Sequence, residues 1–276
     1  MVNLCQKFAS NRNLKFSTNT NPEKSKTKCL IFSKKVKERE NVLPILLNGV
    51  PLPWVEKVKH LGSTLQLDNS MEMDIAQKRG KFIGKMQSLL QEFHYVEKEV
   101  FVKIMNIYTT SFYGSCLWDL FSSGCDKLYK SWNVAIRQVL SVDRCTHRYL
   151  IEKISRTFHP KVMLASRLVN FHKKMTASSK LCVRLLARLC EKDLRTVLGK
   201  TLNKLCDIIG SSEIGDLTAN IIKKNMTYYD VPDNETWRVN SVTELIKVRD
   251  QFLSIPGFTD VEVKFMLDHI CTSALH

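Results

Sequence analysis

The sequence predicts an α+β protein that is mainly helical and carries a small antiparallel β region near its amino terminus. Before residue 71, short apolar runs alternate with turn residues, and Asn48-Gly49 is the pair that best adopts the left-handed backbone of a two-residue hairpin turn. From residue 71 onward, apolar residues recur with the 3.6-residue period of amphipathic helices. We therefore expect a β-containing region at 1–70 and helices from residue 71 onward.

The first region is expected to hold one short helix and several strands. The helix covers residues 3–12 and turns Leu4, Cys5 and Phe8 inward. A polar segment containing Asn21-Pro22 breaks the chain between two strands. The expected strands are 14–17, 28–33, the hairpin around Asn48-Gly49 and a further strand at 55–66.

The helical regions are expected to bury one apolar stripe per helix. In the helix at 71–93 the stripe consists of Ile75, Phe82, Met86, Leu89 and Phe93. The same pattern recurs in Cys182, Leu185, Leu186 and Leu189, whose spacing favours burial, while Trp118 and Trp132 are interpreted as core aromatics. A last pair of helices is expected near 241–253 and 260–271.

Charge is the unusual property of the composition. The chain holds 42 Lys and Arg against 27 Asp and Glu, a net charge of +15. The excess lies in residues 1–210, because residues 211–276 hold ten acidic and six basic side chains. A field of this sign favours polyanionic partners such as nucleic acid.

Cysteine usage and hydropathy bear on the compartment. The nine cysteines follow no repeating interval, which favours reduced thiols and an intracellular, reducing setting, whether nucleus or cytoplasm. The longest uncharged run, Ile104 to Trp118, is shorter than the roughly 20 apolar residues of a membrane span, so no membrane partner is expected.

Two motifs carry a resemblance to a known family. Residues 21–33 read NPEKSKTKCLIFS, and residues 60–63 read HLGS. In order and spacing they resemble the last two palm motifs of reverse transcriptases from non-LTR (LINE-type) retrotransposons, which are RNA-directed DNA polymerases. The NGVPL segment at 48–52 and the segments at 255–258 and 271–273 extend the resemblance.

The resemblance implies a domain order and a missing part. Residues 1–70 would be the carboxy-terminal part of the palm, 71–150 a helical thumb and 151–276 a helical extension. The family's Asp-Asp hairpin, which holds two catalytic metal ions, would precede Met1. The amino-terminal part of the polymerase would then be a missing partner of this fragment.

The resemblance also implies site residues. Lys26-Thr27 matches the family's Lys-Thr dipeptide beside the incoming nucleotide, and Lys26 occupies the position of the general acid that protonates pyrophosphate. Lys24 and Lys28 flank it as nucleic-acid contacts, and His60-Leu61-Gly62 matches the primer-grip strand and turn. Without the resemblance, the lysines are an ordinary solvated turn and His60 a structural histidine.

Two basic rows on helices are further candidates for phosphate contacts. Lys78, Lys81 and Lys85 lie to one side of the apolar seam of the helix at 71–93. A second row, Lys180, Arg184, Arg188 and Lys192, repeats every four residues and is expected opposite Leu185 and Leu189. For either row a solvated face is an equal alternative, because phosphate binding leaves only a charge signature.

No metal site or cofactor is assigned. Two-metal nucleotide transfer needs clustered carboxylates, and no two acidic residues are adjacent in the chain. Glu72 with Asp74 and Glu97 with Glu99 open expected helices, where the helix dipole favours anions. The cysteine spacings are unlike those of zinc modules. Mg²⁺ is expected only for the full-length family member.

The sequence thus predicts a polymerase fragment that binds the duplex of RNA template and DNA primer through phosphates, without sequence preference, and is inactive alone. Two alternatives stay open. The chain is a domesticated helical module that binds a protein, or it is the non-folding product of a decayed element.

Overall fold

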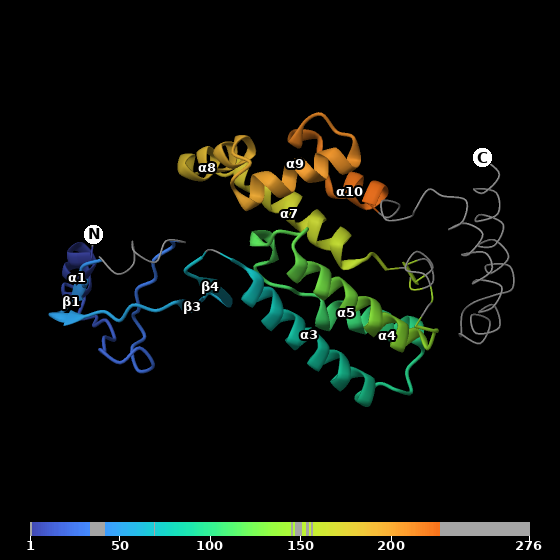
Figure 1. Ribbon diagram of the computed structural model, residues 1–276, viewed down its shortest axis with the longest axis horizontal. Helices are drawn as coiled ribbons and strands as arrows, with labels where there is room; N and C mark the ends of the chain where they lie inside the picture. Colours follow the sequence, from blue (N-terminus) through green and yellow to red (C-terminus); the bar gives the residue numbers. More distant parts are fainter. Residues whose placement is uncertain are drawn as a thin grey trace, which may run out of the picture. The chain divides into compact units, whose positions relative to one another are not determined.

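The computed structural model describes residues 2–33, 42–68, 70–144, 146, 151–152, 155 and 157–226 (Figure 1). The expected helices at 241–253 and 260–271 and the resemblance segments at 255–258 and 271–273 lie outside these residues. The described part is mainly helical and contains a small antiparallel β region, as the sequence predicts. One compact unit ends at Asp74, and a second begins at Ile75.

The first unit contains helix α1 (Val2–Ser10) and two separate antiparallel ribbons. Strands β1 (Leu46–Leu47) and β2 (Val50–Pro51) form the first ribbon, and their turn residues Asn48 and Gly49 have φ angles of 53° and 75°. These left-handed angles are those of a type I′ turn, so the predicted hairpin is confirmed.

The second ribbon corrects the single strand expected at 55–66. That segment folds back on itself as β3 (Lys57–His60) and β4 (Ser63–Gln66), which pair with His60 opposite Ser63. The turn residues Leu61 and Gly62 have φ angles of 46° and 82°. The prediction missed this turn because leucine rarely adopts a positive φ.

Two other expectations for this unit are wrong. Residues 14–17 and 28–33 do not form regular strands; Cys29 alone makes an isolated parallel bridge, to Trp54. Leu4 and Phe8 of α1 are 72% and 56% exposed instead of facing inward. Residues 29 and 33 do make backbone hydrogen bonds, with Pro53, Val55 and Leu67, but these are too few and too scattered to form a regular ladder.

The second unit is a helical assembly whose first helix, α3 (Glu72–Glu92), continues from the first unit. Four residues of its predicted stripe are buried, which confirms the orientation, while Phe93 lies half-buried just beyond the helix. Trp118 and Trp132 are fully buried, as predicted. The remaining elements are α4 (Lys98–Thr109), η1 (Ser115–Leu117), α5 (Ser123–Leu140), α7 (Pro160–Thr176), α8 (Leu181–Lys192), α9 (Val197–Ile209), η2 (Ile214–Asp216) and α10 (Ala219–Met226).

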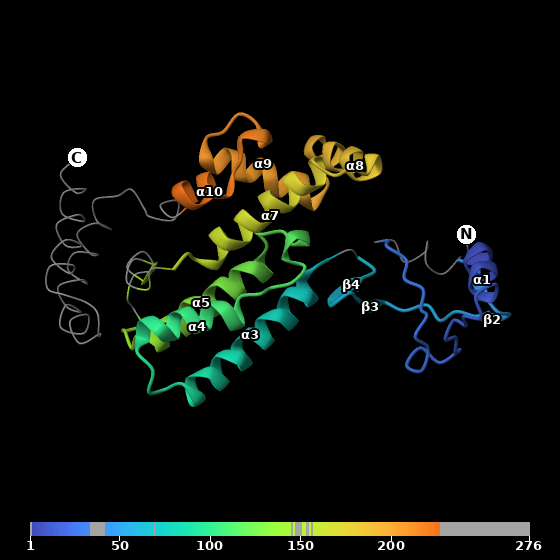
Figure 2. The same cartoon turned by 180° about the vertical axis from the view of Figure 1, so that it is seen from behind.

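Helix α7 connects the layers of this unit. It packs against α5 and η1 on one side and against α8 and α10 on the other (Figures 1 and 2). His159 caps its first turn by accepting a hydrogen bond from the Lys161 amide at 3.2 Å. The His159 ring also contacts Tyr129 and Trp132 of α5, with ring centroids 5.2 and 5.3 Å apart. This histidine therefore joins the start of α7 to the aromatic core.

Helix α8 contradicts its predicted orientation. Leu185, Leu186 and Leu189 are 48%, 53% and 65% exposed, and Cys182 is exposed as well. Ala187, on the opposite side, is the residue that this helix buries. The leucines face away because α7 and α9 pack against the Ala187 side. None of the helices in the described ranges is long and apolar enough to cross a membrane.

Candidate functional site

The lysine motif lies in a turn that is organised by short polar side chains. Asn21 Oδ1 accepts a hydrogen bond from the Glu23 amide at 2.9 Å, and the buried Ser25 hydroxyl donates to the Thr27 carbonyl at 2.6 Å. Lys24 and Lys26 are exposed around this hydroxyl, and Lys28 is half-buried where the chain approaches Trp54. The turn therefore presents two ammonium groups to solvent from an ordered backbone.

The segment that resembles a primer grip is the tip of the β3–β4 ribbon. His60 ends β3 and is exposed, and Leu61 and Gly62 form the turn, with Leu61 75% exposed. Asp74 holds the ribbon close to this tip, because its carboxylate accepts a hydrogen bond from the Thr64 amide at 2.9 Å. Asp74 is 1% exposed and belongs to the first turn of α3, so this acidic residue has a structural partner.

The three predicted lysines of α3 separate into two kinds. Nζ of Lys78 donates to the Tyr113 carbonyl and also lies over the rings of Tyr113 and Trp118. Nζ of Lys85 donates to the Tyr108 carbonyl at 3.0 Å. Lys81 is exposed on the same helix. Of these three lysines, Lys81 is the one whose exposed side chain best suits a phosphate contact.

Carbonyl binding by basic side chains recurs in this unit. Lys98 donates to the Leu140 carbonyl at the end of α5, at 3.1 Å. Arg137 donates to the Thr146 carbonyl, and Arg167 donates to the carbonyls of Thr110 and Ser111 just beyond α4. Carbonyls near helix ends lack partners within the helix and attract cations. Part of the net positive charge therefore serves the fold.

A lysine cluster that the sequence did not single out surrounds Phe121. Nζ of Lys204 lies 4.3 Å from the centre of the Phe121 ring, and Nζ of Lys161 lies 5.3 Å from it. Lys200 lies one turn before Lys204 on α9 and pairs with Asp119 at 3.4 Å. Two ammonium groups thus lie over the Phe121 ring, and a third pairs with Asp119, two residues before it in the chain.

This cluster is composed from three places in the sequence. Lys161 comes from the start of α7, Lys200 and Lys204 from α9, and Phe121 from the loop before α5. The only local signal was the four-residue spacing of Lys200 and Lys204, which is common on solvated helices. Ammonium groups bind the phosphates of single-stranded and duplex nucleic acids by charge, and a nearby aromatic ring can in addition stack with the unpaired bases of a single strand.

The described residues offer no metal site and no activated thiol among the three cysteines discussed below. Among the residues that the structure describes, no three His, Cys, Asp or Glu side chains are grouped so as to hold a metal ion. Burial raises the pKa of the Cys29, Cys116 and Cys206 thiols. A raised pKa keeps these thiols protonated at neutral pH, so they are poor nucleophiles.

Comparisons of the chain with protein-family models, with characterised proteins and with solved structures found no match.

Proposed function

We propose that the chain is a nucleic-acid-binding fragment of an RNA-directed DNA polymerase of the non-LTR retrotransposon type. In this proposal residues 1–70 derive from the palm, 71–150 from the thumb and 151–276 from a helical extension. Lys24, Lys26, Lys28 and the His60-Leu61-Gly62 tip face template and primer, and Lys81 contacts phosphates. The fragment does not polymerise nucleotides alone, because its sequence contains no adjacent acidic pair for two metal ions.

The observation that carries this proposal is the lysine cluster around Phe121. Like charges that gather beside one ring repel each other, and a bound phosphate backbone relieves this repulsion. Lys200 pairs with Asp119, and Lys161 and Lys204 lie over the Phe121 ring, so α7 and α9 bring three basic side chains to this part of the unit. A net charge of +15 supports the same class of partner.

The proposal is tested by fluorescence anisotropy with a labelled RNA–DNA duplex over a range of salt concentrations. We expect binding at low salt that weakens steeply as salt rises, because each phosphate contact releases counterions. The triple variant Lys161→Gln, Lys200→Gln and Lys204→Gln should flatten the plot of log affinity against log salt by about 2 to 3 units.

A matched control separates local contacts from net charge. Lys127, Lys130 and Lys174 are exposed elsewhere on the same unit, and changing them to Gln removes the same charge. Equal effects of the two triple variants would assign binding to net charge and not to the cluster. No binding at low salt would overturn the proposal as a whole. Incorporation of labelled nucleotide with Mg²⁺ or Mn²⁺, above a heat-inactivated control, would overturn the inactive state.

A further inference from the structure

The outer side of α8 carries an apolar stripe with no partner element in the described part of the chain. Leu181, Leu185, Leu186 and Leu189 form this stripe, here called the leucine face, and each is between 48% and 65% exposed. At about 100° per residue, Leu181, Leu185 and Leu189 fall within about 80° of one another. Ala187, the buried residue of α8, points roughly 160° away from their centre.

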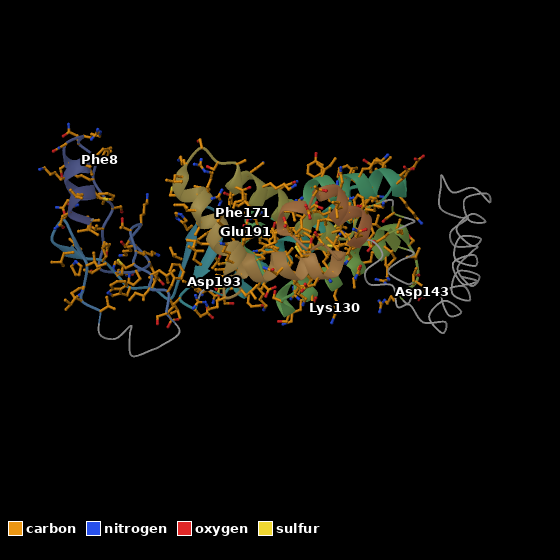
Figure 3. All side chains as sticks on the ribbon, turned by 90° about the horizontal axis from the view of Figure 1, so that it is seen from above. Phe8, Lys130, Asp143, Phe171, Glu191 and Asp193 are labelled. Carbon is orange, nitrogen blue, oxygen red and sulfur yellow. The ribbon has the colours of Figure 1, made fainter. Side chains whose placement is uncertain are left out.

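The outward orientation of the leucine face is fixed by contacts on the inner side of α8. Oε1 of Glu191 lies 2.8 Å from Nε2 of His172 on α7, and the His172 side chain is almost fully buried. Figure 3 labels Glu191 and, just after the end of α8, Asp193. The Thr196 hydroxyl donates to the Asp193 carbonyl at 2.8 Å. The backbone of Gly199 lies so close to the Cys190 carbonyl that no side chain fits between them. A rotation of α8 that buries its leucines would break these contacts.

Basic residues border the leucine face along one edge. Arg184, Arg188 and Lys192 each follow a leucine of the stripe by three residues, which places them in a parallel row about 60° around the helix. This corrects the expectation that the row lies opposite the leucines. The other edge contains Cys182, Leu186 and Cys190, which carry no cation. Charge on one edge only is a feature that a partner can match.

We propose that the leucine face is the docking site for an amphipathic helix of another protein, with acidic residues along one edge. The apolar residues of the partner helix cover the leucines, and its carboxylates pair with Arg188 and Lys192. Paired helices in general combine an apolar seam with flanking charges in this way. A second copy of this chain fits less well, because an antiparallel pair of α8 helices would bring the two basic edges together. A membrane surface fits less well, because interfacial helices carry cations across the polar face and aromatic residues beside the leucines.

The test uses the full chain and a synthetic fluorescent peptide helix with leucines at heptad positions a and d, and with glutamates on one side of this seam and glutamines on the other. Fluorescence anisotropy should show saturable binding, and a scrambled peptide of identical composition should bind at least about tenfold more weakly. Leu185→Gln with Leu189→Gln should weaken binding by at least about tenfold, since few central residues carry most of a helix-docking interface. The matched control is Ile107→Gln with Val134→Gln, which removes apolar side chains that are 73% and 56% exposed on α4 and α5.

Charge reversal and a native thiol give independent readouts. The double variant Arg188→Glu, Lys192→Glu should weaken binding of the glutamate peptide and strengthen binding of a peptide with lysines in place of the glutamates, because the edge then carries negative charge. Cys182 is exposed beside the leucines, so bound peptide should slow its alkylation, as followed by peptide mapping.

Several results would overturn this proposal. The first is equal affinity for the designed and scrambled peptides, which would show binding by net charge alone. The second concerns vesicles made of equal parts of phosphatidylcholine and phosphatidylserine. If the leucine variant loses binding to these vesicles but binds the peptide as well as the wild type does, the leucine face would be assigned to a lipid surface. The third is a concentration-dependent dimer in sedimentation equilibrium that the same variant abolishes, which would assign it to a second copy.

Discussion

Arg167 on α7 donates a hydrogen bond of 2.8 Å to the carbonyl oxygen of Thr110, the residue that follows the last residue of α4. The same nitrogen also donates to the Ser111 carbonyl at 2.9 Å. The guanidinium thereby supplies a donor to carbonyls that the helix itself leaves without partners and joins two helices that are far apart in sequence. Burial lowers the pKa of this side chain, yet an arginine stays charged at any ordinary pH.

Replacing Arg167 by Met should therefore lower the free energy of unfolding by about 1.5 to 3 kcal/mol, the range for hydrogen bonds to charged groups. Urea unfolding followed by the fluorescence of the buried Trp118 and Trp132 measures this change. Arg188→Met removes the same charge from an exposed position and should change stability by less than about 0.5 kcal/mol. Equal effects of the two substitutions would mean that the carbonyl contacts contribute nothing.

Lys81 and Lys85 offer a comparison within one helix. Lys85→Met should cost about 0.5 to 1 kcal/mol of stability, because its ammonium group binds the Tyr108 carbonyl. Lys81→Met should leave stability unchanged and weaken duplex binding at low salt. Unfolding and anisotropy titrations on both variants provide the measurement. The reverse pattern would show that Lys85, and not Lys81, meets the phosphates.

Gly199 is required by a close approach of two backbones. A Cβ atom at this position would overlap the Cys190 carbonyl oxygen and lie 2.7 Å from that of Asp193. Gly199→Ala should therefore destabilise the protein by about 1 to 3 kcal/mol, since the atoms that a Cβ would meet are mostly backbone atoms, which move less readily than side chains. Gly80→Ala on α3 meets open space and should stabilise it by about 0.5 to 1 kcal/mol, because alanine favours helix. Thermal melting of both variants measures these changes. Similar melting midpoints for Gly199→Ala and Gly80→Ala would contradict the close packing of α8 on α9.

Tyr129 predicts how stability depends on alkaline pH. Burial, followed by the neighbouring Cys125, raises its pKa well above the ordinary value, and its hydroxyl donates to the Leu120 carbonyl at 3.0 Å. The folded protein thus keeps a proton that the unfolded chain loses near its ordinary pKa of about 10. The contribution of the protonated Tyr129 to the free energy of unfolding is complete below that pH and declines as the pH rises above it.

Tyr129→Phe supplies the control for this pH dependence. The variant should be less stable at neutral pH by about 1 kcal/mol, through the lost hydrogen bond. Its unfolding free energy should fall less than that of the wild type between pH 9.5 and about 11, in urea titrations at each pH. If the unfolding free energies of the variant and the wild type fell in parallel, Tyr129 would not be the cause of the loss of stability at alkaline pH.

Features set by local geometry could be predicted from the sequence. The turn at Asn48-Gly49 was recognised because both residues tolerate positive φ, and α3 was oriented correctly because its stripe is long and unambiguous. The turn at Leu61 was missed because its backbone is imposed by pairing of β3 with β4, which overrides the preference of leucine. Local preference decides a turn only when it agrees with the pairing around it.

Features set by tertiary contacts escaped prediction. The apolar pattern of α8 is as regular as that of α3, but periodicity states which residues share a side and not which side meets the core. The lysine cluster around Phe121 likewise depends on α7 and α9 meeting the loop before α5. The contacts of Lys78 and Lys85 with carbonyls could not be read from spacing, since a lysine that binds a carbonyl and one in solvent occupy the same helical positions.

The two ribbons of the first unit each consist of a single strand pair. Every strand in them therefore keeps one hydrogen-bonding side without a neighbouring strand in the described residues, and an additional strand of suitable length can extend either ribbon. When the chain is concentrated, the most available donors of such strands are its own copies. The strands are only two and four residues long, and β3 carries Lys57 and Lys59, so short length and like charge both hinder such pairing between copies.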